Sequence, residues 1–265
     1  MRFKSSDYIY KDLIAITKHF SIWILLGSQD IKLRYRRSTL GPFWISLSMA
    51  ITVYSLGFIY SNLFHVALKD YLPYLASGII CWSFISSLIL EGSNAFIESA
   101  NYIKNQEVFL SLFMMRIFYR NTIILLHNLF VFIPLFFIFD LNLSLKFLFI
   151  IPGWLIIGFN LLFWGSLLAI IGTKYRDFGP IVSSIVQIVF FLTPIMWPTY
   201  LLSNEYQWII ECNPFNQFLN LIRAPLMNQT MSSSALSIIF IISITGFLLY
   251  GCIFEKYKHR IIFWI

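Results

Sequence analysis

The sequence predicts an all-α integral membrane protein with six transmembrane helices. Its composition is the first observation behind that prediction. Of the 265 residues, 58% are apolar and only 12% are charged, and the mean hydropathy is +0.76. Soluble domains of this length carry about a quarter charged residues. The composition therefore argues against a soluble globule, a disordered chain and a nucleic-acid-binding domain, despite the net charge of +7.

The spacing of the charges is the second observation. A transmembrane helix needs roughly 20 apolar residues, because lipid offers no hydrogen-bond partner to a bare peptide group. We expect the chain, residues 1–265, to be a single transmembrane domain. The charge-free stretches that can span are 41–61, 71–90, 121–139, 147–172, 178–202 and 235–254.

The distribution of lysine and arginine gives the orientation. Six spans place both ends of the chain on one side, and lysine and arginine accumulate on the cytoplasmic side of membrane proteins. Of the nineteen such residues, sixteen fall on the side of the termini, and the other side receives only Lys69, Lys146 and Arg223. We therefore predict that both termini are cytoplasmic.

The segment 1–37, before the first span, combines an amphipathic pattern with a basic cluster. Lys11 and Lys18 lie opposite an apolar stripe formed by Ile9, Leu13, Ile16, Phe20 and Trp23. This pattern is typical of a helix that lies in the membrane interface, although a simple leader into the first span is an alternative. The basic cluster that follows consists of Lys32, Arg34, Arg36 and Arg37.

Two connections on the predicted cytoplasmic side are candidate docking surfaces. The longer, residues 91–120, alternates charged and apolar residues, which predicts short amphipathic helices with a partly apolar exposed surface. The shorter, residues 173–179, is a tight loop that exposes charged side chains between two spans.

The only long external connection, residues 203–234, is not plainly polar. Its apolar residues predict short helices, broken at Pro214 and Pro225, that dip back into the outer leaflet. An ordinary loop packed on the ends of the spans is the alternative.

The sequence lacks residues that would supply energy or catalysis. It has no phosphate-binding loop, no nucleophile triad and no metal motif, and Cys81, Cys212 and Cys252 are too widely spaced to suggest a metal site. No span holds a charged residue at mid-depth, although ion-coupled carriers generally need one there. We therefore expect no catalytic residue, metal or cofactor in this chain, and energy supplied by a partner protein.

Polar and aromatic residues share one face of the fifth predicted span. This mixture suits the lining of a path for an amphipathic substrate. Aromatic rings in such a lining can stack on sugars. A lipid-facing or packing surface is the alternative. The predicted lining residues are Tyr54 and Phe58 on the first span, and Ser183, Gln187, Phe190, Phe191 and Trp197 on the fifth.

Four segments together resemble a known family. These segments are Leu26–Trp44, Lys174–Asp177, Leu192–Pro198 and Asn213–Phe215. They are similar to those of type-2 ABC exporter permeases for polysaccharides, over essentially the whole chain. Among the subfamilies the chain looks closest to lipopolysaccharide O-antigen export permeases, with capsule and teichoic acid permeases as near relatives.

The resemblance implies a homodimer of six-span subunits in a bacterial inner membrane, bound by two separate cytoplasmic ATPase subunits that hold ATP and magnesium. It implies a channel lined largely by spans one and five, and external re-entrant helices over 206–226. It also implies ATPase contacts through the two docking connections, for which the candidate residues are Glu91, Glu98, Lys104, Glu107, Tyr175, Arg176 and Asp177.

The expected substrate is a polyprenyl-pyrophosphate-linked glycan. We expect its pyrophosphate to be drawn to Lys32, Arg34, Arg36 and Arg37, since arginine pairs well with phosphate oxygens. The alternative is that these residues only fix the topology. A drug or lipid ABC exporter and a polyprenyl-phosphate glycosyltransferase are rival functions; the second is disfavoured because no Asp-x-Asp cluster is present.

Overall fold

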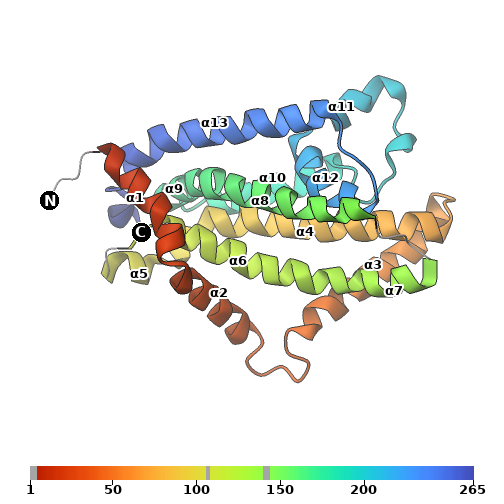
Figure 1. Ribbon diagram of the computed structural model, residues 1–265, viewed down its shortest axis with the longest axis horizontal. Coiled ribbons are helices and arrows are strands. Elements are labelled where there is room, and N and C mark those ends of the chain that lie inside the picture. The colour runs from red at the N-terminus through yellow and green to blue at the C-terminus, as the bar shows by residue number, and fades with distance from the viewer. Residues whose placement is uncertain (1–4, 106–107, 140–143) are drawn as a thin grey trace.

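The computed structural model describes residues 5–105, 108–139 and 144–265, and every regular element in those ranges is a helix (Figure 1). Five helical segments are long and apolar enough to cross a membrane: Phe43–Leu63, Leu68–Asn105, Ser111–Phe139, Leu145–Lys174 and Ser233–Tyr257. They coincide with five of the six predicted stretches. The all-α, multi-pass membrane architecture is thus confirmed.

Several of these segments are composed of consecutive helices. The first span is α3 (Phe43–Leu63), and the second is α4 (Leu68–Glu98) followed by α5 (Ala100–Asn105). The third consists of α6 (Ser111–Asn128), η1 (Leu129–Val131) and α7 (Phe132–Phe139). The fourth consists of η2 (Leu145–Phe149), α8 (Ile150–Asn160), a π-helical turn η3 (Leu161–Gly165) and α9 (Ser166–Lys174). The last is α13 (Ser233–Tyr257), which is followed by α14 (Ile261–Trp264).

Helix α4 lies at the centre of the bundle (Figure 1). Helices α3, α6 and α9 pack against it, as do α10 (Phe178–Leu192) and α12 (Pro214–Leu226). Leu75, Ala76, Ile80 and Cys81 on α4 are completely buried. Small residues such as Gly78 let neighbouring backbone approach closely, which is how helices associate in lipid.

The segment predicted as the fifth span differs from the prediction. Its helix, α10, ends at Leu192, so it holds 15 residues and is about 22 Å long. This length is shorter than a hydrocarbon core of about 30 Å. Thr193 has an extended backbone, because the proline at 194 disfavours helical geometry in the residue before it. The short helix η4 (Thr199–Leu201) follows.

The amphipathic segment before the first span forms two helices instead of one. They are α1 (Ser5–Lys18) and α2 (Phe20–Arg34), which meet at His19. The indole Nε1 of Trp23 donates a hydrogen bond to the carbonyl oxygen of Ile16 at 2.9 Å and so joins them. Helix α1 packs on α6 and α13, and α2 packs along α6.

The two ends of the bundle differ in content (Figure 1). Helices α1, α5 and α14, which include the first and last described helices, lie at one end, which we call the terminal end. The connection 203–232 lies at the other, the distal end, and contains η5 (Asn204–Tyr206), α11 (Gln207–Glu211) and α12. A helix begins at Pro214 as predicted, but Pro225 lies in the last turn of α12 and does not break it.

Candidate functional site

The basic cluster lies at the end of α2 and in the turn that follows. Lys32, Arg34, Arg36 and Arg37 are all exposed, and the connection between α2 and α3 projects from the side of the bundle (Figure 1). Of these four, Arg34 alone lies near a carboxylate of a described residue, with Nη2 3.9 Å from Oε1 of Glu91. Among the described residues, Arg36 and Arg37 form no ion pair. Their charges are therefore available to an anion.

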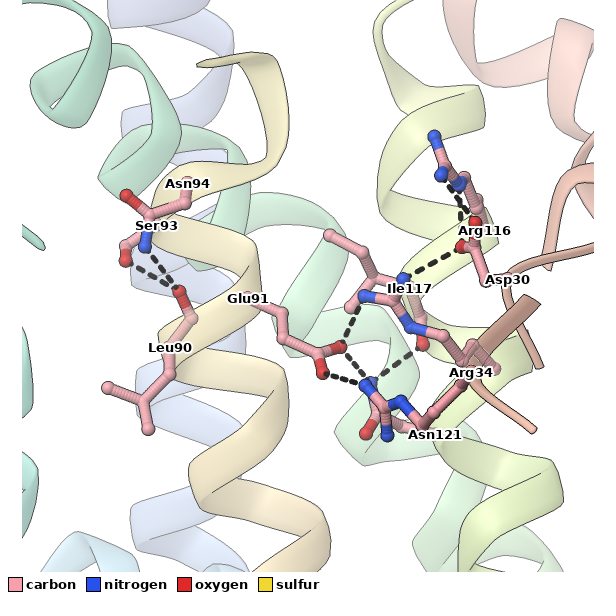
Figure 2. A network of polar contacts seen from close by, with 10 residues as sticks. Asp30, Arg34, Leu90, Glu91, Ser93, Asn94, Arg116, Ile117 and Asn121 are labelled. Atoms are coloured by element: carbon pink, nitrogen blue, oxygen red, sulfur yellow. Dashed lines mark hydrogen bonds and ion pairs between the residues drawn. The ribbon is translucent and has the colours of Figure 1, made fainter. Parts of the chain in front are cut away.

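A network of ion pairs lies beside this cluster and joins α2, α4 and α6 (Figure 2). Arg116 donates to Asp30 from Nε at 2.8 Å and from Nη2, and Arg120 donates from Nη1 to Oδ2 of Asp30 at 2.7 Å. Arg120 Nη2 also donates to Oε2 of Glu91 at 2.8 Å. The amide of Asn121 donates to the same carboxylate oxygen.

The network fixes α2 against the core of the bundle. The side chains of Asp30, Arg116 and Arg120 are only 13%, 17% and 10% exposed, so these charges are poorly solvated and depend on one another. The sequence supplied a signal for this arrangement, since Arg116 and Arg120 are four residues apart on one helix face. Their charge was assigned only to topology, and the pairing with Asp30 was missed.

The two predicted docking connections lie side by side at the terminal end. Helix α9 approaches α4 so closely that a Cβ at Gly172 would overlap the carbonyl oxygen of Ser93. A Cβ at Gly179, in the first turn of α10, would lie 3.1 Å from the side-chain oxygen of Asn94. Residues 91–98 are the last two turns of α4, so α5 is the one separate short helix among the described residues of this connection.

The candidate coupling residues differ in how free their side chains are. Glu91 is held in the ion-pair network, and Glu107 lies outside the described residues. The remaining candidates are exposed: Glu98, Lys104, Tyr175, Arg176 and Asp177. Their contact with a partner stays a prediction.

Helices α3 and α10 both pack on α4, and each exposes polar side chains along an apolar surface. On α3 these are Ser48, Thr52, Ser55 and Asn62, near the 65% exposed Phe58. On α10 they are Ser183, Ser184 and Gln187, near the 66% exposed Phe191.

The other three predicted lining residues are half-buried. The hydroxyl of Tyr54 donates to the carbonyl oxygen of Val131 at 2.8 Å, so this side chain packs against η1. The ring centroid of Phe190 lies 5.9 Å from that of Trp82 on α4. The indole Nε1 of Trp197 donates to the carbonyl oxygen of Phe191 at 3.2 Å. Their place in a lining stays a prediction.

Two sequence segments that carry the family resemblance meet at the distal end. Asn213 caps α12, because its Oδ1 accepts from the backbone nitrogens of Phe215 and Asn216. Its Nδ2 donates to Oγ1 of Thr193 at 3.0 Å, just after the end of α10. Arg223, which the sequence assigned only to the external charges, lies buried beside this junction at 5% exposure.

The described residues contain no group of three or more histidine, cysteine, aspartate or glutamate side chains that could hold a metal ion. The candidate site consists of the exposed basic cluster, the ion-pair network beside it and the polar stripes on α3 and α10. Such features suit binding and movement of a charged, partly polar molecule.

Comparison with known proteins agrees with this description. Residues 22–227 match the family model described as "ABC-2 type transporter". Two proteins of Klebsiella pneumoniae, both named O-antigen export system permease protein RfbA, are 26% identical over 248 residues and 24% identical over 245 residues. Each alignment covers 91% of this chain and 93% of the relative. ABC-2 permeases pair with ABC ATPase subunits. The chain belongs to the ABC-2 type transporter family, as a membrane permease whose 265 residues include no ATPase domain.

Proposed function

We propose that this permease exports a polyprenyl-pyrophosphate-linked polysaccharide, of the O-antigen class, across a bacterial inner membrane. The names of the two Klebsiella proteins support the substrate class, since the alignments extend over nearly their whole length. In this proposal two copies of the chain form the transmembrane path, and two ATPase subunits bind ATP and magnesium on the cytoplasmic side.

The observation that carries the proposal is the exposure of hydroxyl and amide side chains on α3 and α10. Ser183 and Gln187 on α10 form no side-chain hydrogen bond with another described residue, so they would lose their hydration in hydrocarbon. The hydroxyls of Ser48 and Thr52 donate to carbonyl oxygens of α3 itself. A second copy packed over this surface would enclose both stripes in a shared path. The exposed rings of Phe58 and Phe191 would then supply stacking surfaces for sugars.

We propose six crossings, with α10 and the extended segment after it as the fifth in chain order. Two observations support this topology and the cytoplasmic placement of both termini. The first and last described helices, α1 and α14, lie together at the terminal end of the bundle (Figure 1), and six crossings would place sixteen of the nineteen lysines and arginines on that side.

The roles of the chain follow from its charged surfaces. The basic cluster of Lys32, Arg34, Arg36 and Arg37 attracts the pyrophosphate at the cytoplasmic entrance. The exposed residues at the terminal end, among them Arg176 and Asp177, receive the movement of the ATPase. Packed helices then carry that movement to the path, as in other conformational transitions between subunits.

A deletion strain tests the proposed function. Without this chain, a polyprenyl-linked polysaccharide should accumulate on the cytoplasmic side, and the corresponding glycan should disappear from the cell surface. Expression of the wild-type chain should restore it, as should the Lys69→Met variant, which removes one exposed charge outside the proposed sites. Unchanged surface glycan, or accumulation of a molecule without sugar, would contradict the proposal.

A further inference from the structure

The segment after α10 is held by side chains instead of by helical hydrogen bonds. Non-helical carbonyl groups buried in a membrane protein need internal partners, because lipid provides none. The hydroxyl of Tyr71 donates to Met196 O at 2.7 Å, and the hydroxyl of Tyr74 lies 3.0 Å from both Pro194 O and Trp197 O. The carbonyl groups of this segment are therefore bonded directly to α4.

Arg223 of α12 completes the set of donors. Its Nη1 donates to Pro194 O at 2.6 Å, and its Nη2 lies 3.3 Å from Ile195 O and 3.2 Å from the carbonyl oxygen of Tyr74. The guanidinium carbon lies 3.7 Å from the centroid of the Tyr74 ring, which gives a cation–π contact. Among the described residues Arg223 forms no ion pair, so carbonyl dipoles and an aromatic face compensate its buried charge.

The backbone of α4 is shaped for this contact. A Cβ at Gly78 would overlap the carbonyl oxygen of Ile195 and would lie 3.0 Å from Nη2 of Arg223. On the other side of the segment, Asn213 bonds Thr193 and the carbonyl oxygen of Leu192. The distal end of α10 is thus joined to both α4 and α12.

Over residues 178–190, α10 is attached by packing, and no side-chain hydrogen bond joins this part to another described element. Val182 and Val186 are its only buried residues, and Ile188 is 60% exposed. Its terminal end begins at Asp177, directly after the exposed loop residues Tyr175 and Arg176. The distal end of α10 is therefore held by hydrogen bonds, whereas its terminal end is held by packing alone, with Gly179 against Asn94.

We infer that Arg223 is a positioning residue that pins the distal end of α10, so that α10 pivots at Thr193–Pro194 when its terminal end is displaced. The inference rests on the proposed function, in which the partner ATPase acts on the loop before α10. A tilt of about 10° would move the terminal end of this helix by about 4 Å while its distal end stays in place. Such a displacement is comparable to helix shifts in known conformational transitions.

Two engineered disulfides test the pivot. In a chain whose three cysteines are replaced, one pair is Thr193→Cys with Asn213→Cys at the distal end, and the other is Asn94→Cys with Gly179→Cys at the terminal end. Inverted membrane vesicles that contain the permease and its ATPase are treated with an oxidant, and uptake of polyprenyl-linked glycan from the deletion strain is measured. The same vesicles are then measured again after reduction.

The pivot predicts opposite results for the two pairs. Uptake with the distal disulfide should stay within about twofold of the reduced protein. Uptake with the terminal disulfide should fall at least tenfold and return on reduction. Each single-cysteine variant serves as a control for the substitutions alone. Loss of uptake caused by the distal disulfide, or full uptake with the terminal disulfide formed, would overturn the inference.

Arg223→Met tests the assigned residue. At equal amounts of inserted protein, this variant should lower uptake at least fivefold, whereas Lys69→Met on the same side of the membrane should not. Adding the distal disulfide to Arg223→Met should restore uptake, because the covalent bond replaces the lost contacts. No rescue would show that Arg223 has another role. Absence of uptake by the wild-type protein would instead contradict the proposed function.

Discussion

The hydroxyl of Tyr250 donates a hydrogen bond to Oδ2 of Asp12 at 3.1 Å, although the two residues are 238 positions apart in the chain. The same carboxylate accepts from the backbone nitrogen of Ser111 at the start of α6, and the Ser111 hydroxyl donates to the carbonyl oxygen of Asp12 at 2.7 Å. Asp12 is completely buried. One side chain therefore joins α1, α6 and α13.

This buried carboxylate makes stability depend on pH. Burial raises the pKa of Asp12 from its ordinary value of 3.8 to about 6, while hydrogen bonds from Ser111 and Tyr250 oppose the rise. The folded protein binds the proton more tightly than the unfolded chain, so the stabilisation is complete below pH 3.8 and is lost as pH rises through 6. Between pH 7.5 and 5 the wild type should gain about 1.4 kcal/mol relative to Asp12→Asn.

Thermal unfolding in detergent at the two pH values measures this difference. Asp70→Asn, which alters an exposed carboxylate in the first turn of α4, should show no comparable change relative to the wild type. An equal pH response of wild type and Asp12→Asn would contradict the assignment.

Removing Asp30 should destabilise the protein strongly. Arg116 and Arg120 would lose a shared carboxylate while they remain mostly buried, and breaking a buried pair in this way costs about 3–5 kcal/mol. Unfolding of Asp30→Ala in detergent should therefore begin at a clearly lower temperature. The double variant with Arg120→Met should lose less than the sum of the two single variants, because the residues act in one network. Strict additivity would count against the network.

Neutralising the exposed basic cluster should stop export without affecting insertion. Arg36→Gln with Arg37→Gln removes two charges that form no ion pair among the described residues, so folding has little reason to change. Surface glycan should fall at least tenfold at normal protein levels, since an arginine fork binds phosphate oxygens in a way that glutamine cannot. Normal surface glycan would show that these residues act only on topology.

Neutralising the loop before α10 should separate ATP hydrolysis from export. Arg176→Gln with Asp177→Asn removes two exposed charges at the terminal end. If this loop receives the movement of the ATPase, hydrolysis by the reconstituted complex should continue while the amount of glycan moved per ATP falls at least fivefold. An unchanged ratio would exclude the loop as a coupling contact.

Gly78→Ala should destabilise the protein, because the added methyl group would overlap the carbonyl oxygen of Ile195. Overpacking of this kind costs about 1–3 kcal/mol. The matched control is Gly251→Ala on α13, where no described atom beyond the adjoining residues and backbone of α13 itself lies within 4 Å of an added Cβ. That change should be neutral or slightly stabilising, since alanine favours helix by up to about 1 kcal/mol. Equal unfolding temperatures of the two variants would contradict the close approach at Gly78.

The positions of most spans could be predicted from the sequence, because charged residues are excluded from the lipid hydrocarbon. Five spans were located because each contains a long stretch without charged residues, a requirement that acts on each segment separately. The end of α10 at Leu192 depends on Pro194, which hydropathy does not detect. The division between α1 and α2 at His19 was also missed, because the apolar stripe continues across it.

The candidate site was predicted less completely, since its contacts join distant parts of the chain. Exposed groups such as Arg36 and Asp177 were identified, because an isolated charge beside an apolar span must face water or a partner. The pairing of Asp30 with Arg116 and the burial of Asp12 and Arg223 depend on helix packing. A charged residue among apolar neighbours, as at Asp12 on the stripe of α1, was the available signal for a buried partner.

The widened π-helical turn at Leu161–Gly165 gives the fourth span one surplus residue. At this turn the span is bonded to α13, because Nδ2 of Asn160 donates to Oγ of Ser243 and Nε1 of Trp164 donates to the carbonyl oxygen of Ile242. Deleting a single amino acid there would close the turn into ordinary helix and leave α9 close to its present orientation relative to α8, because the turn already accommodates one extra residue. A deletion within α8 would instead rotate the residues that follow, as far as Asp177, by about 100° while hydropathy stayed nearly the same. The fourth span should therefore tolerate the loss of a residue at this turn better than within α8.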